Sequence, residues 1–238
     1  MSEVVKANGL TKSYGDFKAL DDVNFTIEKG SIVGLIGPNG AGKTSTLKSI
    51  LGLTEFEGEL EVLGTDPRKG RHHVMERVCF IADVGVLPRW LKVSEALDYI
   101  EGVHAGFSRE KAEAMLAETN ISPKQRVKQL SKGMVAQLHL AIVMAIDAKL
   151  LVLDEPTLGL DILFRKRFFD QLLNDYFFGE RTIIISTHQV EEVENILTHV
   201  VFMKHGKVIM HKALSEIEQD YIELHAVGEA AAKARAIP

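Results

Sequence analysis

The chain lacks the features that mark secreted, membrane-spanning or nucleic-acid-binding proteins. Its one cysteine, Cys79, excludes an intrachain disulfide and favours a reducing compartment such as the cytoplasm. Apolar runs such as "AIVMAI" and "LLVL" are far shorter than the roughly 20 residues that span a bilayer. The start, "MSEVVKANGL", has no signal-peptide pattern. The net charge of −5 argues against a nucleic-acid binder with a wholly basic surface. We expect a cytoplasmic protein that binds no nucleic acid, and docking onto a membrane stays open.

An alternation of strands and helices runs through the chain, of which 46% is hydrophobic and can form a full core. Residues up to about 65 predict strands and turns, and residues from about 90 to 128 predict helices. The apolar strands "LLVLD" and "TIIIST" suit a buried parallel sheet, and a hairpin is predicted near His205 and Gly206. This order predicts an α/β core with the central helices as a separate lobe.

Three serines are expected to cap helices. Ser94 and Ser108 precede helical patterns of the lobe, and Ser131 precedes a long one. The apolar residues of that long helix recur at helical spacing: Met134, Leu138, Ala141, Ile142 and Ala145. Lys132 is a poor residue for its first turn, because a helix N-terminus is already positive. An anionic ligand such as phosphate would relieve this conflict.

A phosphate-binding loop is the clearest motif. "GLIGPNGAGKTS" contains G-x-x-x-x-G-K-[ST] from Gly37 to Thr44, after an apolar strand and before a helical pattern, a context that disfavours a chance glycine-rich turn. Lys43 would place its charge on the β- and γ-phosphates, and Thr44 would offer a hydroxyl to Mg²⁺. We expect a nucleotide and Mg²⁺ as ligands, with nucleotide contacts from Gly37, Asn39, Gly40, Ala41, Gly42, Lys43, Thr44 and Ser45.

Charged residues follow both buried strands. Asp154 and Glu155 end "LLVLDE", where Asp154 would hold Mg²⁺ and Glu155 would orient the attacking water. His188 follows "TIIIST" and is expected to hydrogen-bond the γ-phosphate, although a lone histidine is usually structural. His72 and His73 lie in a polar run and are interpreted as a solvated loop, not as metal ligands.

Taken together, these motifs resemble the ATPase subunit of an ABC transporter, particularly bacterial exporter-type members. The order is the family's: "GPNGAGKTS", "LSKGM", "LLVLDEP", "LGLD" and "STH". The resemblance covers about residues 4–214. It implies that adenine stacks on Tyr14, which by itself could equally be a strand-surface tyrosine. The implied fold is an α/β P-loop NTPase core with a parallel sheet, an N-terminal antiparallel β subdomain and an inserted α-helical subdomain.

The same resemblance implies a purpose for "LSKGM". In this family two ATPase domains, identical or related, face each other head to tail. Ser131 and Gly133 would cap the γ-phosphate held by the partner's phosphate loop, and Asp161 would couple the two sites. ATP closes the dimer and hydrolysis opens it, which would drive an integral membrane permease. The protein would then lie on the inner face of the cell membrane and serve export.

Some positions depart from the family pattern. Asp83 stands where the family usually has Gln or Glu; it could still bind Mg²⁺, but its reach to water is shorter. "LSKGM" replaces the commoner "LSGGQ", and Gln137 replaces a frequent Arg. The apolar loop "VGVLPRW", with Pro88 and Trp90, suits a socket for a partner helix, and ordinary packing of the lobe is an equal alternative.

One ATPase domain is expected to span residues 1–238. Residues 1–87 and 135–220 would form the nucleotide-binding core with the β subdomain, residues 88–134 the helical subdomain, and residues 221–238 a short tail. A soluble ABC ATPase of the assembly or iron–sulfur type is an alternative to a transport engine. A nucleotide switch without hydrolysis is a third possibility, which the intact Lys43, Asp154, Glu155 and His188 oppose.

Overall fold

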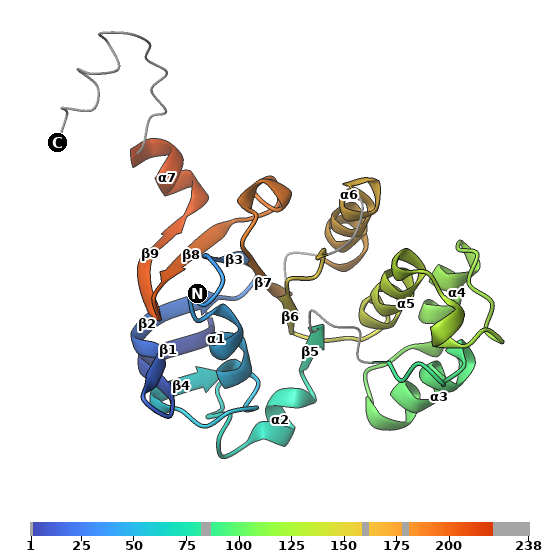
Figure 1. Cartoon of the computed structure of the whole chain (residues 1–238), viewed down its shortest axis with the longest axis horizontal. Helices are drawn as coiled ribbons and strands as arrows, with labels where there is room; N and C mark the ends of the chain where they lie inside the picture. The colour runs from blue at the N-terminus through green and yellow to red at the C-terminus, as the bar shows by residue number, and fades with distance from the viewer. Residues whose placement is uncertain (1, 82–86, 159–161, 178–180, 221–238) are drawn as a thin grey trace, which may run out of the picture.

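A computed structural model describes residues 2–81, 87–158, 162–177 and 181–220 of the chain. Figure 1 shows one small sheet and one large sheet side by side, with a group of helices at the opposite end of the molecule. Asp83, Asp161, residues 84–86 of the apolar loop and the tail beyond residue 220 lie outside the described residues.

The N-terminal residues form the expected antiparallel β subdomain. Its strand order is β2-β1-β4, with bounds Glu3–Tyr14 for β1, Phe17–Glu28 for β2 and Glu57–Val62 for β4. A turn at Gly15, whose φ is 58°, joins β1 to β2 and pairs Tyr14 directly with Phe17. Glycine adopts this left-handed conformation without steric cost, so the turn is tight and both aromatic residues stand at its base.

The larger sheet has the order β5-β6-β7-β3-β8-β9 and is parallel except for β9. Every residue of β3, β6 and β7 is buried, which confirms the prediction from their continuous apolar runs. The predicted hairpin at His205–Gly206 joins β8 to β9. The strand bounds are Ile32–Ile36 (β3), Val78–Ile81 (β5), Leu150–Asp154 (β6), Thr182–Thr187 (β7), His199–Lys204 (β8) and Lys207–Ala213 (β9).

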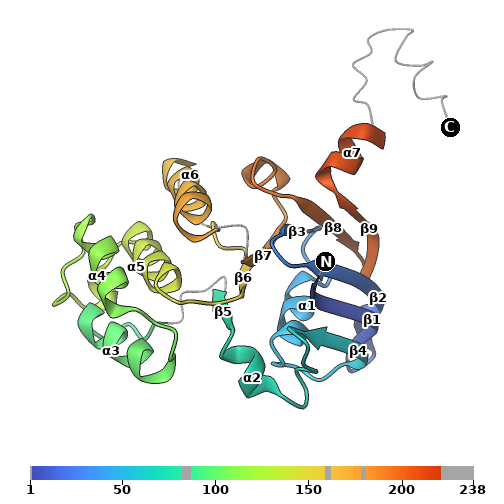
Figure 2. The ribbon, with the colours of Figure 1, turned by 180° about the vertical axis from the view of Figure 1, so that it is seen from behind.

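Seven α-helices are present in the described part of the chain, and Figure 2 shows α3, α4 and α5 grouped away from the small sheet. The bounds are Lys43–Ile50 (α1), Arg71–Met75 (α2), Val93–Val103 (α3), Arg109–Ala117 (α4), Lys132–Met144 (α5), Ile162–Gln171 (α6) and Leu214–Asp220 (α7). Short turns of 3₁₀-helix cover Val127–Gln129 and Val190–Glu192, and a π-helical turn covers Leu172–Tyr176. The fold is therefore the expected α/β arrangement with an added helical group.

Two of the three predicted helix caps are confirmed. The Ser108 side chain accepts a hydrogen bond from Lys111 N, and the Ser131 side chain accepts one from Met134 N. The prediction for Ser94 is wrong, because α3 begins at Val93 with Lys92 as its N-cap. The first N–H groups of α3 are bound by backbone instead: Val93 N donates to the Gln125 carbonyl oxygen at 2.9 Å and Ser94 N to the Pro123 carbonyl oxygen at 3.0 Å. The Glu95 carboxylate accepts from the Lys92 backbone N–H at 2.8 Å.

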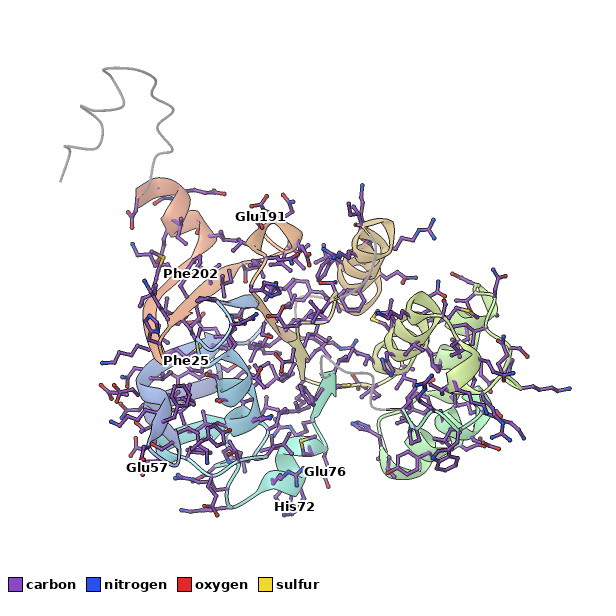
Figure 3. All side chains as sticks on the ribbon, viewed as in Figure 1. Phe25, Glu57, His72, Glu76, Glu191 and Phe202 are labelled. Carbon is purple, nitrogen blue, oxygen red and sulfur yellow. The ribbon has the colours of Figure 1, made fainter. Side chains whose placement is uncertain are left out.

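His72 and His73 correct a second local expectation. They belong to the short helix α2 rather than to a loop, although both are exposed as expected. Figure 3 shows His72 and Glu76 on the outer side of this helix. Within the described residues no cluster of three or more His, Cys, Asp and Glu side chains could hold a metal ion.

Apolar side chains form one cluster on each face of the large sheet. Cys79 lies in one of them, and burial raises the pKa of its thiol to about 12, so the thiol stays protonated at neutral pH. None of the described helices has both the length and the apolar character needed to cross a bilayer.

Candidate functional site

The carboxyl ends of the parallel strands bring distant motifs together. Ile36 at the end of β3 pairs with Thr187 of β7, and Asp154 at the end of β6 pairs with Ser186 of β7. The residues that follow these pairs therefore leave the same edge of the sheet. Ligands bind at this edge in open α/β sheets.

The phosphate loop requires glycine because of its own surroundings. A Cβ atom at Gly37 would lie 2.3 Å from the Met203 carbonyl oxygen, and one at Gly42 would lie 2.7 Å from the Ala19 carbonyl oxygen. Gly42, with φ of 108°, is also the N-cap of α1 and offers no side chain to its free N–H groups. No acidic residue stands in the first turn of α1. These N–H groups are therefore suited to bind an anion.

Lys43 lies where a phosphate chain would need charge. Its side chain is only 6% exposed, and its Nζ donates to the Gly37 carbonyl oxygen at 2.7 Å. The same Nζ lies 3.3 Å from Oε1 of Glu155. The ammonium group of Lys43 thus lies between the phosphate loop and the Glu155 carboxylate, at the N-terminus of α1.

Asp154 and Thr44 provide a fitting donor set for Mg²⁺. Thr44 Oγ1 lies 3.4 Å from Asp154 Oδ1, and Ser186 Oγ donates to the same carboxylate oxygen at 2.5 Å. Asp154 is 6% exposed. Mg²⁺ is commonly held by one or two carboxylates together with substrate phosphates and water, so one carboxylate and one hydroxyl suffice on the protein side. Ser186 orients the carboxylate, a role that sequence reasoning missed.

Glu155 has an unusual backbone conformation for a residue with a side chain. Its φ is 47°, and its N–H is held by the Ser186 carbonyl oxygen and hydroxyl, each at 3.1 Å. Left-handed non-glycine residues cost free energy and cluster at functional sites. The conformation places the Glu155 carboxylate beside Lys43 and 2.9 Å from Nδ1 of His188.

Lys43, Thr44, Glu155 and His188 line a cavity of about 450 Å³, while Gly37 and Asp154 lie outside its lining. Tyr14 stands at its edge and is 49% exposed. Partial burial raises the pKa of Tyr14, but hydrogen bonds with Ser45 and Thr54 and the charges of nearby lysines lower it by more. The cavity lining comprises Tyr14, Phe17, Ala19, Asn39, Gly40, Ala41, Gly42, Lys43, Thr44, Ser45, Glu155, Leu158 and His188.

Phe17 is a site residue that sequence reasoning missed. It is 62% exposed, yet it lines the cavity beside Tyr14 because the hairpin pairs the two residues directly. Directly paired residues on neighbouring strands project to the same face. The turn "YGDF" was the available signal, since two residues between the aromatics indicate a tight hairpin.

Ser131 and Gly133 do not join this cavity. They lie at the start of α5, in the helical group, and neither is among the cavity-lining residues. Ser131 is exposed and caps its own helix. Asp83 and Asp161, the other two predicted site residues, lie outside the described part of the chain.

Proteins with similar sequences support the interpretation of this cavity as a nucleotide site. The sequence profile described as "ABC transporter" matches residues 20–158. The Nod factor export ATP-binding protein I of Burkholderia lata is 34% identical over 226 residues, covering 90% of this chain and 74% of that protein. The bacitracin transport ATP-binding protein BcrA of Bacillus licheniformis is 32% identical over 230 residues, covering 94% and 72%.

Solved structures show the same fold. The ATP-binding subunit of an ABC transporter superposes with a TM-score of 0.80 at 27% identity, covering 91% of this chain and 92% of that chain. The cbiO1 protein of Clostridium perfringens, part of the ABC transporter complex cbiONQ, superposes with a TM-score of 0.76 at 25% identity, covering 92% of each chain. Profile, relatives and fold all agree with the cavity, and the chain therefore belongs to the ABC transporter family, as an ATP-binding subunit that hydrolyses ATP.

Proposed function

We propose that the cavity binds ATP with Mg²⁺ and that the energy of hydrolysis drives a separate membrane permease, in the direction of export. The observation that carries this proposal is the meeting of Lys43, Glu155 and His188 in one cavity with the phosphate loop. Lys43 and the loop N–H groups bind the phosphates, while Tyr14 stacks on the adenine. The direction rests on the Nod factor export relative.

The chemical step uses groups of this chain. Glu155, held by Lys43 and His188, orients and polarises the attacking water, and His188 hydrogen-bonds the γ-phosphate. Thr44 and Asp154 would hold Mg²⁺, with Asp83 as a further candidate ligand. When bound, Mg²⁺ neutralises charge on the transferred phosphate.

We infer that the chain acts as a head-to-tail dimer with an identical or related chain. Ser131 and Gly133 lie at the start of α5, where Ser131 and Lys132 are exposed and the first turn has no acidic residue. Ser131 caps the Met134 N–H, and the γ-phosphate on a partner would bind at the same helix start. Asp161 would lie at the same seam. The division into core, residues 88–134 as helical subdomain, and tail remains part of this proposal.

The helical group is the proposed docking site for the permease at the inner face of the cell membrane. Trp90 is 66% exposed, and Tyr99 and Val103 are each 62% exposed. Tyr99 and Val103 lie one turn apart on α3, so they share a face. Large apolar side chains gathered in this way mark interaction surfaces.

Purification from the native cell tests the proposal. The tagged chain is isolated in mild detergent, and its stoichiometric partners are identified. We expect a multi-span membrane protein, and we expect its recovery to fall with Trp90→Glu and Tyr99→Glu. Ile209→Glu is the matched control, because Ile209 is 63% exposed on β9, outside the helical group. Only soluble partners, with the chain absent from membranes, would instead favour an assembly-type ATPase.

A further inference from the structure

A chain of polar contacts continues from His188 away from the cavity. His188 Nε2 lies 3.3 Å from Nε2 of Gln189, and Arg165 NH1 donates to Oε1 of Gln189 at 3.3 Å. Arg165 also forms an ion pair with Glu192. Together with the contact of His188 Nδ1 to Glu155 at 2.9 Å, these bonds join α6 to the cavity through one imidazole ring.

The Arg165 guanidinium at one end of this series and the Glu155 carboxylate at the other fix which group donates in each hydrogen bond. A guanidinium only donates, so the amide oxygen of Gln189 must face Arg165 and its NH₂ group must face His188. Nε2 of His188 then accepts, which leaves the ring hydrogen on Nδ1. Glu155, as a carboxylate, accepts that hydrogen. The donor at one end and the acceptor at the other therefore require the same tautomer of His188.

Further contacts hold Arg165 and Glu192, which lie at the end of this series of polar contacts that is farther from the cavity. The Glu192 carboxylate accepts from Thr157 Oγ1 at 2.7 Å, and Thr157 is 4% exposed. Thr157 follows Glu155 by two residues, so Glu192 ties the segment after β6 to Arg165 of α6. The Thr187 hydroxyl accepts from Gln189 N at 3.0 Å, which shapes the turn that carries His188.

We propose that Gln189 and Arg165 are positioning residues, which hold His188 as its Nδ1–H tautomer, with that N–H aimed at Glu155, while no γ-phosphate is bound. Imidazole in free histidine favours hydrogen on Nε2, so the proposed state is a departure that an experiment can detect. Lys43 and Glu155 face the ring from the cavity, and Arg165 and Glu192 face it from the other side. The tautomer follows from these contacts alone, whereas any effect on turnover rests on the proposed roles of Glu155 and His188.

Nitrogen NMR of ¹⁵N-histidine-labelled protein tests the proposal, with His188→Gln to assign the signal among the nine histidines. We expect hydrogen on Nδ1 in the wild type. Gln189→Leu removes a neutral hydrogen bond and should move the tautomer ratio about fivefold toward Nε2–H. Gln189→Glu places an acceptor at Nε2, so that nitrogen should carry a hydrogen. Gln171→Leu on α6 is the matched control and should change nothing.

A wild-type His188 with hydrogen on Nε2, or a ratio indifferent to both Gln189 variants, overturns the proposal. Steady-state kinetics give a second readout. A γ-phosphate oxygen only accepts, so Nε2 of His188 must carry the hydrogen when ATP is bound, and Gln189→Leu, which favours that tautomer, should raise kcat/KM for ATP severalfold. A tautomer shift without a change in kcat/KM would leave the hydrogen-bond chain intact as a finding and would instead contradict the contact of His188 with the γ-phosphate.

Discussion

Two helices of this protein begin with the same local chemistry and different surroundings. Both α1 and α5 have lysine as first residue, Lys43 and Lys132, and neither has an acidic residue in its first turn. The start of α1 has no side-chain cap, and Lys43 is 6% exposed within the cavity. The start of α5 is capped by Ser131 and faces solvent. The chain thus has two helix N-termini without acidic residues in the first turn, one at the cavity and one at the surface.

Gly37, which opens the phosphate loop before α1, and Gly133, at the start of α5, show the same contrast. A Cβ at Gly37 would lie 2.3 Å from the Met203 carbonyl oxygen, so the chain's own fold requires glycine there. A Cβ at Gly133 would find its nearest atom, the Ser131 hydroxyl oxygen, at 4.0 Å. The difference teaches that no neighbour among the described residues requires glycine at position 133, so a partner chain is the proposed source of such a requirement. Four experiments can break or sharpen this comparison.

Glu155→Gln should have the largest effect. Removing a group that polarises water should lower ATP turnover about 10²- to 10⁴-fold, because such groups contribute that much to catalysis. The start of α5 is untouched, so ATP should still close the dimer and the closed form should accumulate. Turnover by phosphate release and dimerisation by size-exclusion chromatography measure the two effects. Hydrolysis at the normal rate would contradict the role of Glu155.

Gly133→Ala separates the two helix starts. Alanine in a helix should leave stability unchanged or raise it by roughly 0.5–1 kcal/mol. Yet the added methyl should lower turnover by up to about 10²-fold, as expected for a small displacement of a contact to phosphate. Nucleotide binding to single chains should be unchanged. Gly37→Ala is the contrasting variant and should unfold more easily. Full activity of Gly133→Ala would argue against the dimer proposal.

Tyr14→Ala and Phe17→Ala test the base-binding end of the cavity. Loss of stacking on Tyr14 should cost about 1–3 kcal/mol of ATP binding, and loss of Phe17 should cost less because no ring stacking is assigned to it. Titration with a fluorescent ATP analogue gives the dissociation constants. Inorganic tripolyphosphate, which has no base, is the control ligand. Equal weakening of both ligands would place the effect on the fold rather than on the base.

Ser131→Ala should give the smallest of these effects, a loss of stability, and sharpen the comparison at α5. It removes the hydrogen bond to Met134 N, and loss of such a cap costs about 1 kcal/mol. Ser131→Asp keeps a capping oxygen, so its melting temperature should stay near that of the wild type. Its carboxylate should nevertheless repel a partner's phosphate and prevent ATP-dependent dimers. If Ser131→Asp dimerised normally with ATP, this helix start would not face phosphate.

Much of the fold followed from local patterns. The buried runs at Ile32–Ile36, Leu150–Asp154 and Thr182–Thr187 predicted parallel strands, because both faces of such strands are covered. Caps were less predictable. Ser94 is a better capping residue than Lys92, yet α3 starts at Val93, because the Gln125 and Pro123 carbonyl oxygens accept from its first two N–H groups. Backbone of another segment can thus override a capping preference.

The chain's own residues determined the phosphate loop, the order of strands and helices, and the type of chemistry. Each depends on residues close in sequence, where backbone preference and side-chain spacing act directly. Only the tertiary structure decided that Ser186 orients Asp154 and that Arg165 of α6 reaches Gln189, beside His188. These contacts join residues brought together by strand pairing and helix packing, and no local pattern records the distance between their side chains.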